Sequence, residues 1–371
     1  MTSAKTGGTA LYRYEPDYAI PPGDIIAEFI EERGMTQVEL ARRLGVTTKH
    51  LNQLIGASVS LSNELAIALE RVTGTPARFW NSLEANYQDF EARKREVDNL
   101  SADLPWLDEL PLKELITRGH IQDKRSRPVD QLREVLKFFG VAGRSSFDEV
   151  CASAAYRKSN AYGSDQYAVA AWLRVGELQA AGVQCEPFDK SAFRSALREI
   201  RSLTKLTDPD VWRPRLTELC AASGVVVLLV PEIGKSRLSG AARWLAPDKA
   251  LIQLSLRGRW AEAFWFTFFH EAAHVLLHSK KRTFIDDGQS SDELEGEADR
   301  FALDFLIPTE YLPRMATLRT APDVRAFANA VGVGSGIVAG RLHKGNMIPK
   351  NWLNKADIHR PTSTCQASVP A

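Results

Sequence analysis

A short stretch of the sequence places histidine and glutamate at a spacing used by metal-dependent hydrolases. The residues His270-Glu271-Ala-Ala-His274 have the form HExxH. Residues four apart in a helix lie on one face, so both imidazoles can bind the same metal ion. Glu271 lies beside them and can take a proton from metal-bound water. We therefore predict a zinc (Zn2+) site with His270 and His274 as ligands and Glu271 as the catalytic base.

A catalytic zinc ion needs a third protein ligand, and several side chains compete for that place. His278 continues the histidine stripe, but three successive turns reach one ion poorly, so we expect an ordinary histidine at a helix end. A second predicted helix carries Glu295, Glu297 and Asp299. We favour Glu295 over Glu297 as the ligand, because Glu295 shares one face with Asp299. Asp299 would then orient a histidine ligand by accepting its second ring N–H.

These groups together predict hydrolysis of a peptide bond. The metal would lower the pKa of a bound water toward neutrality and polarise the substrate carbonyl. Glu271 would remove the proton from that water and later pass it to the leaving amine. Arg243 and Arg237 are candidates for steadying the oxyanion, and either can equally be a surface or structural arginine.

Two predicted strands accompany this site. Residues 224–231 form an apolar run bounded by glycine and proline, which is typical of a buried strand. Residues 250–256 alternate apolar and polar side chains, which predicts a strand with one buried face. We expect the second strand to be the edge strand that holds substrate by backbone pairing, with both arginines in the loop before it.

A different pattern lies near the N-terminus. Residues 36–39 (Thr-Gln-Val-Glu) fit a capping box that opens a short helix, and Gly45 supplies the left-handed turn that ends it. Thr47 or Thr48 would cap a second helix over residues 49–55. Two such helices form a helix-turn-helix, whose second helix can enter a DNA major groove. A helical hairpin that only packs or dimerises is the alternative.

Six polar residues of this module can contact DNA: Gln37, Arg42, Arg43, Thr48, Lys49 and Asn52. Residues 1–100 nevertheless carry 11 basic and 14 acidic side chains, a net charge of −3. Counterion release needs a local basic face, so we expect binding to rest on a narrow patch and on a homodimer.

Composition and length exclude several classes of protein for this chain. The 371 residues include 47 basic and 46 acidic side chains, which argues against a polybasic protein or an acidic disordered tail. The length predicts two or three domains. The four cysteines contain no CxxC pair, no apolar run exceeds seven residues, and the first ten residues have no apolar core. We therefore expect a cytoplasmic protein without a membrane partner.

The expected fold class is mainly α with a smaller β component (α+β). We expect a flexible lead-in (1–20), a helix-turn-helix domain (21–95), a helical middle region without assigned role (96–214), an α+β domain (215–353) and a disordered tail (354–371). A fainter helix-turn-helix pattern at 324–342 echoes the first one, but its glycines make it a poor DNA reader. We expect it to pack against the α+β core.

Two family resemblances emerge from these motifs. Residues 34–46, 61–69 and 79–87, the last reading Phe-Trp-Asn-Ser-Leu-Glu-Ala-Asn-Tyr, resemble the HigA-type antitoxins of the XRE-like helix-turn-helix family. This resemblance covers residues 21–95. It implies a homodimer that binds operator DNA, with neutralisation of a cognate toxin as a further implication.

The C-terminal part resembles the ImmA/IrrE family of metallopeptidases. The resemblance rests on residues 266–278, 295–302 and 305–308, with further similarity at 237–244 and 250–256. It implies a zincin-like fold and proteolysis of a protein partner, often a helix-turn-helix repressor. Asp299 stands where the family often has asparagine, and either side chain can bond a histidine.

Three hypotheses follow. The first is a DNA-binding regulator fused to a zinc metallo-endopeptidase that cleaves a repressor or antitoxin, its own linker included. The second is a non-enzymatic antitoxin and autorepressor whose zincin domain serves as a sensor or toxin-binding platform. The third is a phage-type or stress-response regulator without a toxin.

Overall fold

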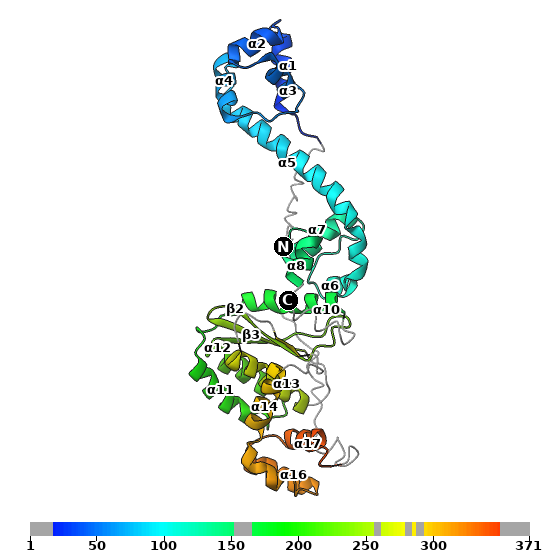
Figure 1. Ribbon diagram of the computed structural model, residues 1–371, viewed down its shortest axis with the longest axis vertical. Helices are drawn as coiled ribbons and strands as arrows, with labels where there is room; N and C mark the ends of the chain where they lie inside the picture. The colour runs from blue at the N-terminus through cyan, green and yellow to red at the C-terminus, as the bar shows by residue number, and fades with distance from the viewer. Residues whose placement is uncertain (1–17, 152–164, 256–260, 279–283, 287–292, 349–371) are drawn as a thin grey trace, which may run out of the picture. The chain divides into compact units, whose positions relative to one another are not determined.

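The structure is a computed structural model, and it describes residues 18–151, 165–255, 261–278, 284–286 and 293–348. The chain divides into two compact units, Met1–Ala102 and Asp103–Ala371 (Figure 1). It is mainly helical with one small sheet, which confirms the predicted fold class. Most of the expected lead-in and the whole expected tail lie outside the described residues.

From residue 18 onward, the first unit contains five helices: α1 (Pro22–Glu32), α2 (Gln37–Leu44), α3 (Thr48–Ile55), α4 (Asn63–Thr73) and α5 (Ala77–Ala102). Leucines of α2, α3 and α4 pack with Trp80 of α5 in a common core. Gly45 ends α2 with a φ of 72°, and the Thr47 hydroxyl caps α3 by accepting from the His50 amide at 3.1 Å. The predicted helix-turn-helix is therefore present as α2 and α3.

The predicted capping box of α2 is only half formed. The Thr36 hydroxyl accepts from the Glu39 amide at 3.1 Å, as expected. The Glu39 carboxylate instead pairs with Arg43, one turn further along the helix. An i,i+4 ion pair on the helix surface thus replaces the expected return bond.

In the residues that the structure describes, the second unit is built on a four-stranded sheet of order β1-β3-β2-β4. The strands are β1 (Val225–Leu229), β2 (Gly240–Ala246), β3 (Lys249–Leu254) and β4 (Phe284–Asp286). β3 pairs in parallel with β1 and antiparallel with β2, and β4 pairs antiparallel with β2. The expectation that residues 250–256 form an edge strand is wrong, because β3 has a neighbour on both sides. Residue 256 lies outside the described residues.

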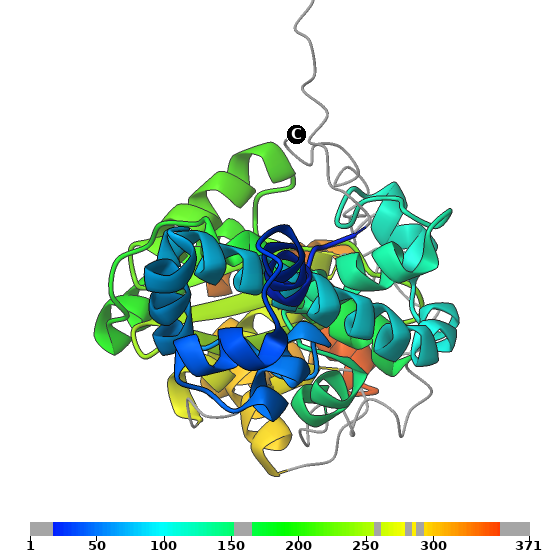
Figure 2. The same cartoon turned by 90° about the horizontal axis from the view of Figure 1, so that it is seen from above.

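Helices cover both faces of this sheet. α10 (Gln166–Ala181) lies on one face, and α11 (Lys190–Leu203), α12 (Pro209–Ala221) and α13 (Ala261–Leu277) lie on the other (Figures 1 and 2). Side chains alternate along β1 accordingly: Val225 and Val227 join the core of α11 to α13, whereas Val226 packs with Ala180 of α10. Helices from the expected middle region therefore help to build the core around the sheet.

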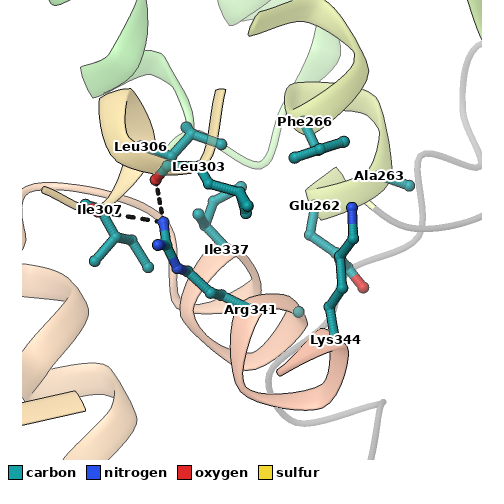
Figure 3. Close-up of a pocket in the computed structure, with 10 residues that line it drawn as sticks. Glu262, Ala263, Phe266, Leu303, Leu306, Ile307, Ile337, Arg341 and Lys344 are labelled. Atoms are coloured by element: carbon teal, nitrogen blue, oxygen red, sulfur yellow. Dashed lines mark hydrogen bonds between the residues drawn. The ribbon is translucent and has the colours of Figure 1, made fainter. Parts of the chain in front are cut away.

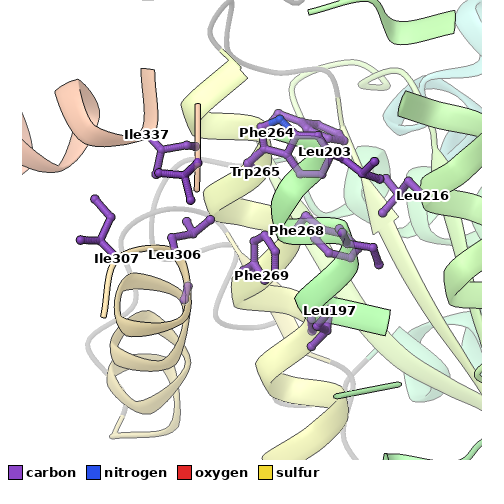
Figure 4. Close-up of a cluster of buried hydrophobic side chains, with 14 of the residues drawn as sticks. Leu197, Leu203, Leu216, Phe264, Trp265, Phe268, Phe269, Leu306, Ile307 and Ile337 are labelled. Atoms are coloured by element: carbon purple, nitrogen blue, oxygen red, sulfur yellow. The ribbon is translucent and has the colours of Figure 1, made fainter. Parts of the chain in front are cut away.

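Large aromatic side chains of α13 form the centre of this core. Phe264, Trp265, Phe268 and Phe269 are all buried and pack with leucines of α11 and α12 (Figure 4). The consecutive aromatic residues make α13 apolar around most of its circumference, which requires a fully covered helix. This burial fixes the position of the HExxH turn that follows directly on the same helix.

The remaining elements in the described part of the second unit are η1 (Leu104–Glu109), α6 (Leu112–Thr117), α7 (Pro128–Phe139), α8 (Arg144–Cys151), α14 (Glu293–Leu306), η2 (Thr309–Tyr311), α15 (Leu312–Met315), α16 (Ala321–Val331) and α17 (Ser335–Lys344). α16 and α17 correspond to the fainter helix-turn-helix pattern, and they meet at Gly332, whose φ is 86°. Phe327 and Ile337 from this pair join the core of α13, as expected for a packing element. None of the described helices is long and apolar enough to cross a membrane.

Candidate metal centre

Two adjacent helices provide the predicted metal-binding residues. α13 carries His270, Glu271 and His274, and α14 carries Glu295 and packs along α13. The side chains of both histidines and of Glu271 are buried within the unit. The amphipathic α14 presents Ala298 and Ala302 to the core, and these small side chains let the two helices approach closely.

The predicted ligand atoms converge. The Nε2 atom of His270 lies 3.0 Å from the Nε2 of His274 and 3.0 Å from the Oε2 of Glu295. The Nε2 of His274 is 3.4 Å from the same oxygen. Two imidazole nitrogens and a carboxylate oxygen form a donor set that zinc takes in catalytic sites, where a further position stays open. The three residues therefore fit a zinc ion.

Asp299 contacts the side of the His270 ring that faces away from the other predicted ligands. Its Oδ1 lies 3.0 Å from the Nδ1 of His270, on the ring nitrogen that does not face the other ligands. Its Oδ2 is 3.4 Å from the Nζ of Lys344, which also lies 4.3 Å from the centre of the Phe266 ring. A carboxylate behind a ligand histidine fixes its tautomer and ring orientation.

Electrostatics favours the protonation states that a metal needs. Burial alone would raise the pKa of Glu295, but hydrogen bonds with His270 and His274, with their coulombic attraction, lower it to about 2. Burial lowers the pKa of His274 below its usual value and outweighs the opposing hydrogen bond with Glu295. An ionised carboxylate and a neutral imidazole are the forms that bind metal ions.

Glu271 lies against the first residue of β2. A Cβ atom on Gly240 would come within 2.7 Å of the Oε1 of Glu271 and 2.7 Å of the Cγ2 of Thr267. Glu271 is 0% exposed, so its carboxylate is held between α13 and the strand. Sequence reasoning did not identify Gly240, and the signal available was a glycine at the start of a strand, which often marks a close approach.

The two arginines that we considered for steadying the oxyanion do not lie in a loop directly before β3. Arg243 belongs to β2, not to a loop, and its Nη2 donates to the Leu173 carbonyl of α10 at 2.7 Å. Gly240 and Ala242 face α13, so Arg243 lies on the opposite face of the sheet. Arg243 is therefore a structural arginine, which is the alternative that the sequence left open. Arg237 precedes β2, where its amide donates to Glu232 at 2.6 Å.

His278 and Glu297 were both set aside as ligands; His278 lies next to His274, and Glu297 lies next to His278. The Nδ1 of His278 is 2.8 Å from the Nδ1 of His274, and its Nε2 is 3.1 Å from the Oε2 of Glu297. Phe284 of β4 stacks on the His274 ring with a centroid distance of 4.2 Å and an interplanar angle of 15°. The four-residue spacing from His274 was the available signal for His278, but its contact with α14 could not be read from the sequence.

An apolar cavity of about 180 Å³ lies between α13, α14 and α17 (Figure 3). Phe266, Leu303 and Ile337 line it, and Lys344 lies at its rim. Arg341 reaches across to the carbonyl oxygens of Leu303 and Ile307 at the C-terminal end of α14. α17 is thereby tied to the helix that carries Glu295, which places Lys344 beside Asp299.

The predicted DNA-contacting residues cluster on α2 and α3. Five are exposed (Gln37, Arg42, Arg43, Lys49 and Asn52) and Thr48 is half-buried. Lys49 and Asn52 are three apart on α3 and therefore share a face. The pairing of Arg43 with Glu39 offsets one positive charge of this small patch.

Comparison with known proteins finds a family match for the N-terminal helix-turn-helix and another for the C-terminal region that carries the predicted metal ligands. Residues 26–80 match the helix-turn-helix family, and residues 246–343 match the family of the IrrE N-terminal-like domain (Peptidase_M78). The uncharacterized HTH-type transcriptional regulator YddM of Escherichia coli strain K12 is 32% identical over 73 residues, which cover 20% of this chain and 78% of that protein.

Two solved structures are similar to the N-terminal part. One is a Pseudomonas aeruginosa protein in complex with its operator DNA, with 33% identity, 20% of this chain and 82% of that chain covered, and a TM-score of 0.20. The other is an addiction module antidote protein of a HigA family from Coxiella burnetii, with 26% identity, 22% and 91% covered, and a TM-score of 0.21. On the sequence matches, the chain belongs to the helix-turn-helix family of transcriptional regulators, and an IrrE-like domain of a metallopeptidase family is fused to its DNA-binding module.

Proposed function

We propose that the chain is a DNA-binding transcriptional regulator whose second unit is a zinc-dependent metallo-endopeptidase. Its substrate is a regulatory protein partner, either a helix-turn-helix repressor or an antitoxin. The observation that carries this proposal is that one ligand atom each of His270, His274 and Glu295 lies within 4.8 Å of the other two. The neighbouring carboxylate of Asp299 completes a constellation that a purely structural helix pair has no need of.

Each side chain then has a defined task. His270, His274 and Glu295 would hold the zinc ion, which would act as a Lewis acid on the scissile carbonyl and lower the pKa of water. Glu271 follows His270 directly, and it accepts the proton of the attacking water and delivers it to the leaving amine. Asp299 keeps His270 in the tautomer that presents its Nε2 to the metal.

An extended substrate segment pairs with β4 in this proposal, not with β3. β4 is an outer strand of the sheet in the described part of the chain, and Phe284 in it stacks on His274. Backbone pairing at an outer strand lets an enzyme hold many sequences in one extended conformation. A peptide bond held there would lie close to the metal ligands.

The first unit binds operator DNA through α3, with Lys49 and Asn52 as the residues that face the groove. Asparagine pairs well with the edge of adenine, and lysine neutralises phosphate. The similarity to the regulator YddM supports this assignment. One module with so few basic side chains binds weakly, so we propose a homodimer that doubles the contact.

Cleavage assays with purified full-length protein test the enzymatic part. The protein is incubated, after zinc loading or chelation, with the proteins encoded beside its gene, and products are mapped by mass spectrometry. We expect zinc-dependent cleavage that Glu271→Gln abolishes and that Glu293→Gln, a matched change at an exposed position of α14, preserves.

Assays with the same partner proteins distinguish this proposal from the non-enzymatic alternative. Operator binding and toxin neutralisation that both survive Glu271→Gln, with no zinc-dependent cleavage of any partner, would identify an antitoxin and autorepressor instead.

A further inference from the structure

We infer that His278 and Glu297 form a second orienting chain, which positions His274 for zinc as Asp299 positions His270. The inference rests on the proposed zinc site and assigns no ligand role to His278. Three contacts define the chain: His274 Nε2 lies among the ligand atoms, His274 Nδ1 is 2.8 Å from His278 Nδ1, and His278 Nε2 is 3.1 Å from Glu297 Oε2.

Hydrogen-bond chemistry leaves one arrangement of protons in this chain. A neutral imidazole carries one N–H, and the nitrogen that binds a metal carries none. If His274 presents Nε2 to zinc, its hydrogen is on Nδ1 and is donated to the Nδ1 of His278. The hydrogen of His278 is then on Nε2, from which it is donated to the carboxylate of Glu297. Each contact has one donor and one acceptor.

The two ligand histidines therefore reach carboxylates of α14 through hydrogen-bond chains of different length. The Nδ1 of His270 meets the carboxylate of Asp299 directly at 3.0 Å. The Nδ1 of His274 reaches the carboxylate of Glu297 only through the ring of His278. Both carboxylates come from α14 and both histidine ligands from α13, so packing of one helix pair builds both chains.

The position of His278 excludes the competing role of a third ligand. Its Nδ1 contacts the Nδ1 of His274, which lies on the ring edge away from the Nε2 that meets His270 and Glu295. Its side chain is 3% exposed, whereas that of Glu297 is 48% exposed. The chain thus runs from a buried ligand to the protein surface, and Phe284 packs against both histidine rings.

Zinc affinity of the full-length protein, measured by competition with a chromophoric chelator, tests the inference. We expect His278→Leu to weaken zinc binding about 10- to 100-fold, the usual effect of losing an outer-shell partner. His278→Gln, which restores an acceptor for the Nδ1–H of His274, should recover part of the affinity. Glu297→Leu should weaken binding less, because Glu297 is half in solvent, and His120→Leu, outside the site, should change nothing.

Nitrogen-15 NMR of the imidazoles in the zinc-loaded wild type gives a readout that does not depend on any variant folding. We expect the hydrogen on Nδ1 in His274 and on Nε2 in His278. A hydrogen on Nδ1 instead of Nε2 in His278, or unchanged affinity in His278→Leu, would overturn the inference while leaving the zinc site in place. A hydrogen on Nε2 of His274, or a wild-type protein that binds no zinc, would overturn the proposed zinc site as well.

Discussion

The carboxylate of Glu271 occupies space that any side chain on Gly240 would need. A Cβ atom at position 240 would lie 2.7 Å from Glu271 Oε1 and 2.9 Å from its Cγ, closer than real Cβ contacts allow. β2 therefore begins with the one residue that lets the strand pass directly beside the proposed base. The sheet thus contributes to the site by positioning Glu271, without providing a ligand.

Gly240→Ala should consequently damage catalysis more than metal binding. The new methyl group would displace Glu271, and a displacement of about 1 Å can cost about 100-fold in rate. The measurement is the cleavage rate together with the zinc dissociation constant. We expect the dissociation constant to stay within about threefold of wild type, because the atoms nearest the new methyl group belong to Glu271 and Thr267 and not to a ligand. Gly182→Ala is the matched control, since its Cβ would meet only a carbonyl oxygen at 3.8 Å. Equal rates in both variants would contradict the role of Gly240.

Removal of zinc should destabilise the second unit. An ion that binds only the folded state stabilises it by about 2.7 kcal/mol when its free concentration is 100 times the dissociation constant. Calorimetry of the full chain with zinc and with a chelator measures this difference. Glu295→Gln should abolish most of the zinc-dependent shift, and Glu293→Gln should retain it. A shift of equal size in Glu295→Gln would show that zinc binds elsewhere.

Arg201 should be important for stability although it is far from the ligand set in sequence. Its guanidinium donates to the carbonyl of Leu306 at 2.9 Å and to that of Val331 at 3.0 Å, which end α14 and α16. Arg201→Met would leave these helix-end carbonyls without the charged donor, at a cost of about 2 kcal/mol or more. Chemical denaturation measures the free energy of unfolding. Arg198→Met on the exposed face of α11 should cost less than about 0.5 kcal/mol.

Two substitutions on α3 should separate recognition of the DNA bases from attraction to the phosphates. Asn52→Ala should weaken binding to the operator by about 1–3 kcal/mol and leave non-specific binding nearly unchanged. Lys49→Ala should weaken binding to every sequence and reduce the salt dependence by about one phosphate contact. Binding curves at several salt concentrations measure both effects. Arg71→Ala, at the C-terminal end of α4, serves as the charge control, and a loss there equal to that of Lys49→Ala would argue against α3 as the reading helix.

Local patterns carried most of what the sequence could predict. The spacing of His270, His274, Glu295 and Asp299 follows from helical periodicity, and the structure brings all four side chains together. Gly45 and Thr47 mark the ends of α2 and α3 because their conformational preferences act within a few residues. The metal and catalytic roles of these residues remain predictions until they are measured.

The remaining features depend on contacts between distant segments. The interior place of β3 is set by β1 and β2, and no alternation within residues 250–254 reveals how many neighbours a strand has. β2 begins Gly-Ala-Ala, a weak strand signal without β-branched residues, so Arg243 was expected in a loop. The contact of His278 with Glu297 joins two helices, and the periodicity of one helix does not show what the other places opposite it.

The most direct test of the central claim compares peptide-bond hydrolysis by wild type and Glu271→Gln at equal zinc occupancy. Both proteins are loaded with zinc, their metal content is verified, and the rate of partner cleavage is measured in each. Loss of the catalytic base predicts a rate at least about 100-fold lower in Glu271→Gln with zinc still bound. Equal rates, or no cleavage of any partner by the zinc-loaded wild type, would contradict a zinc peptidase in which Glu271 is the base.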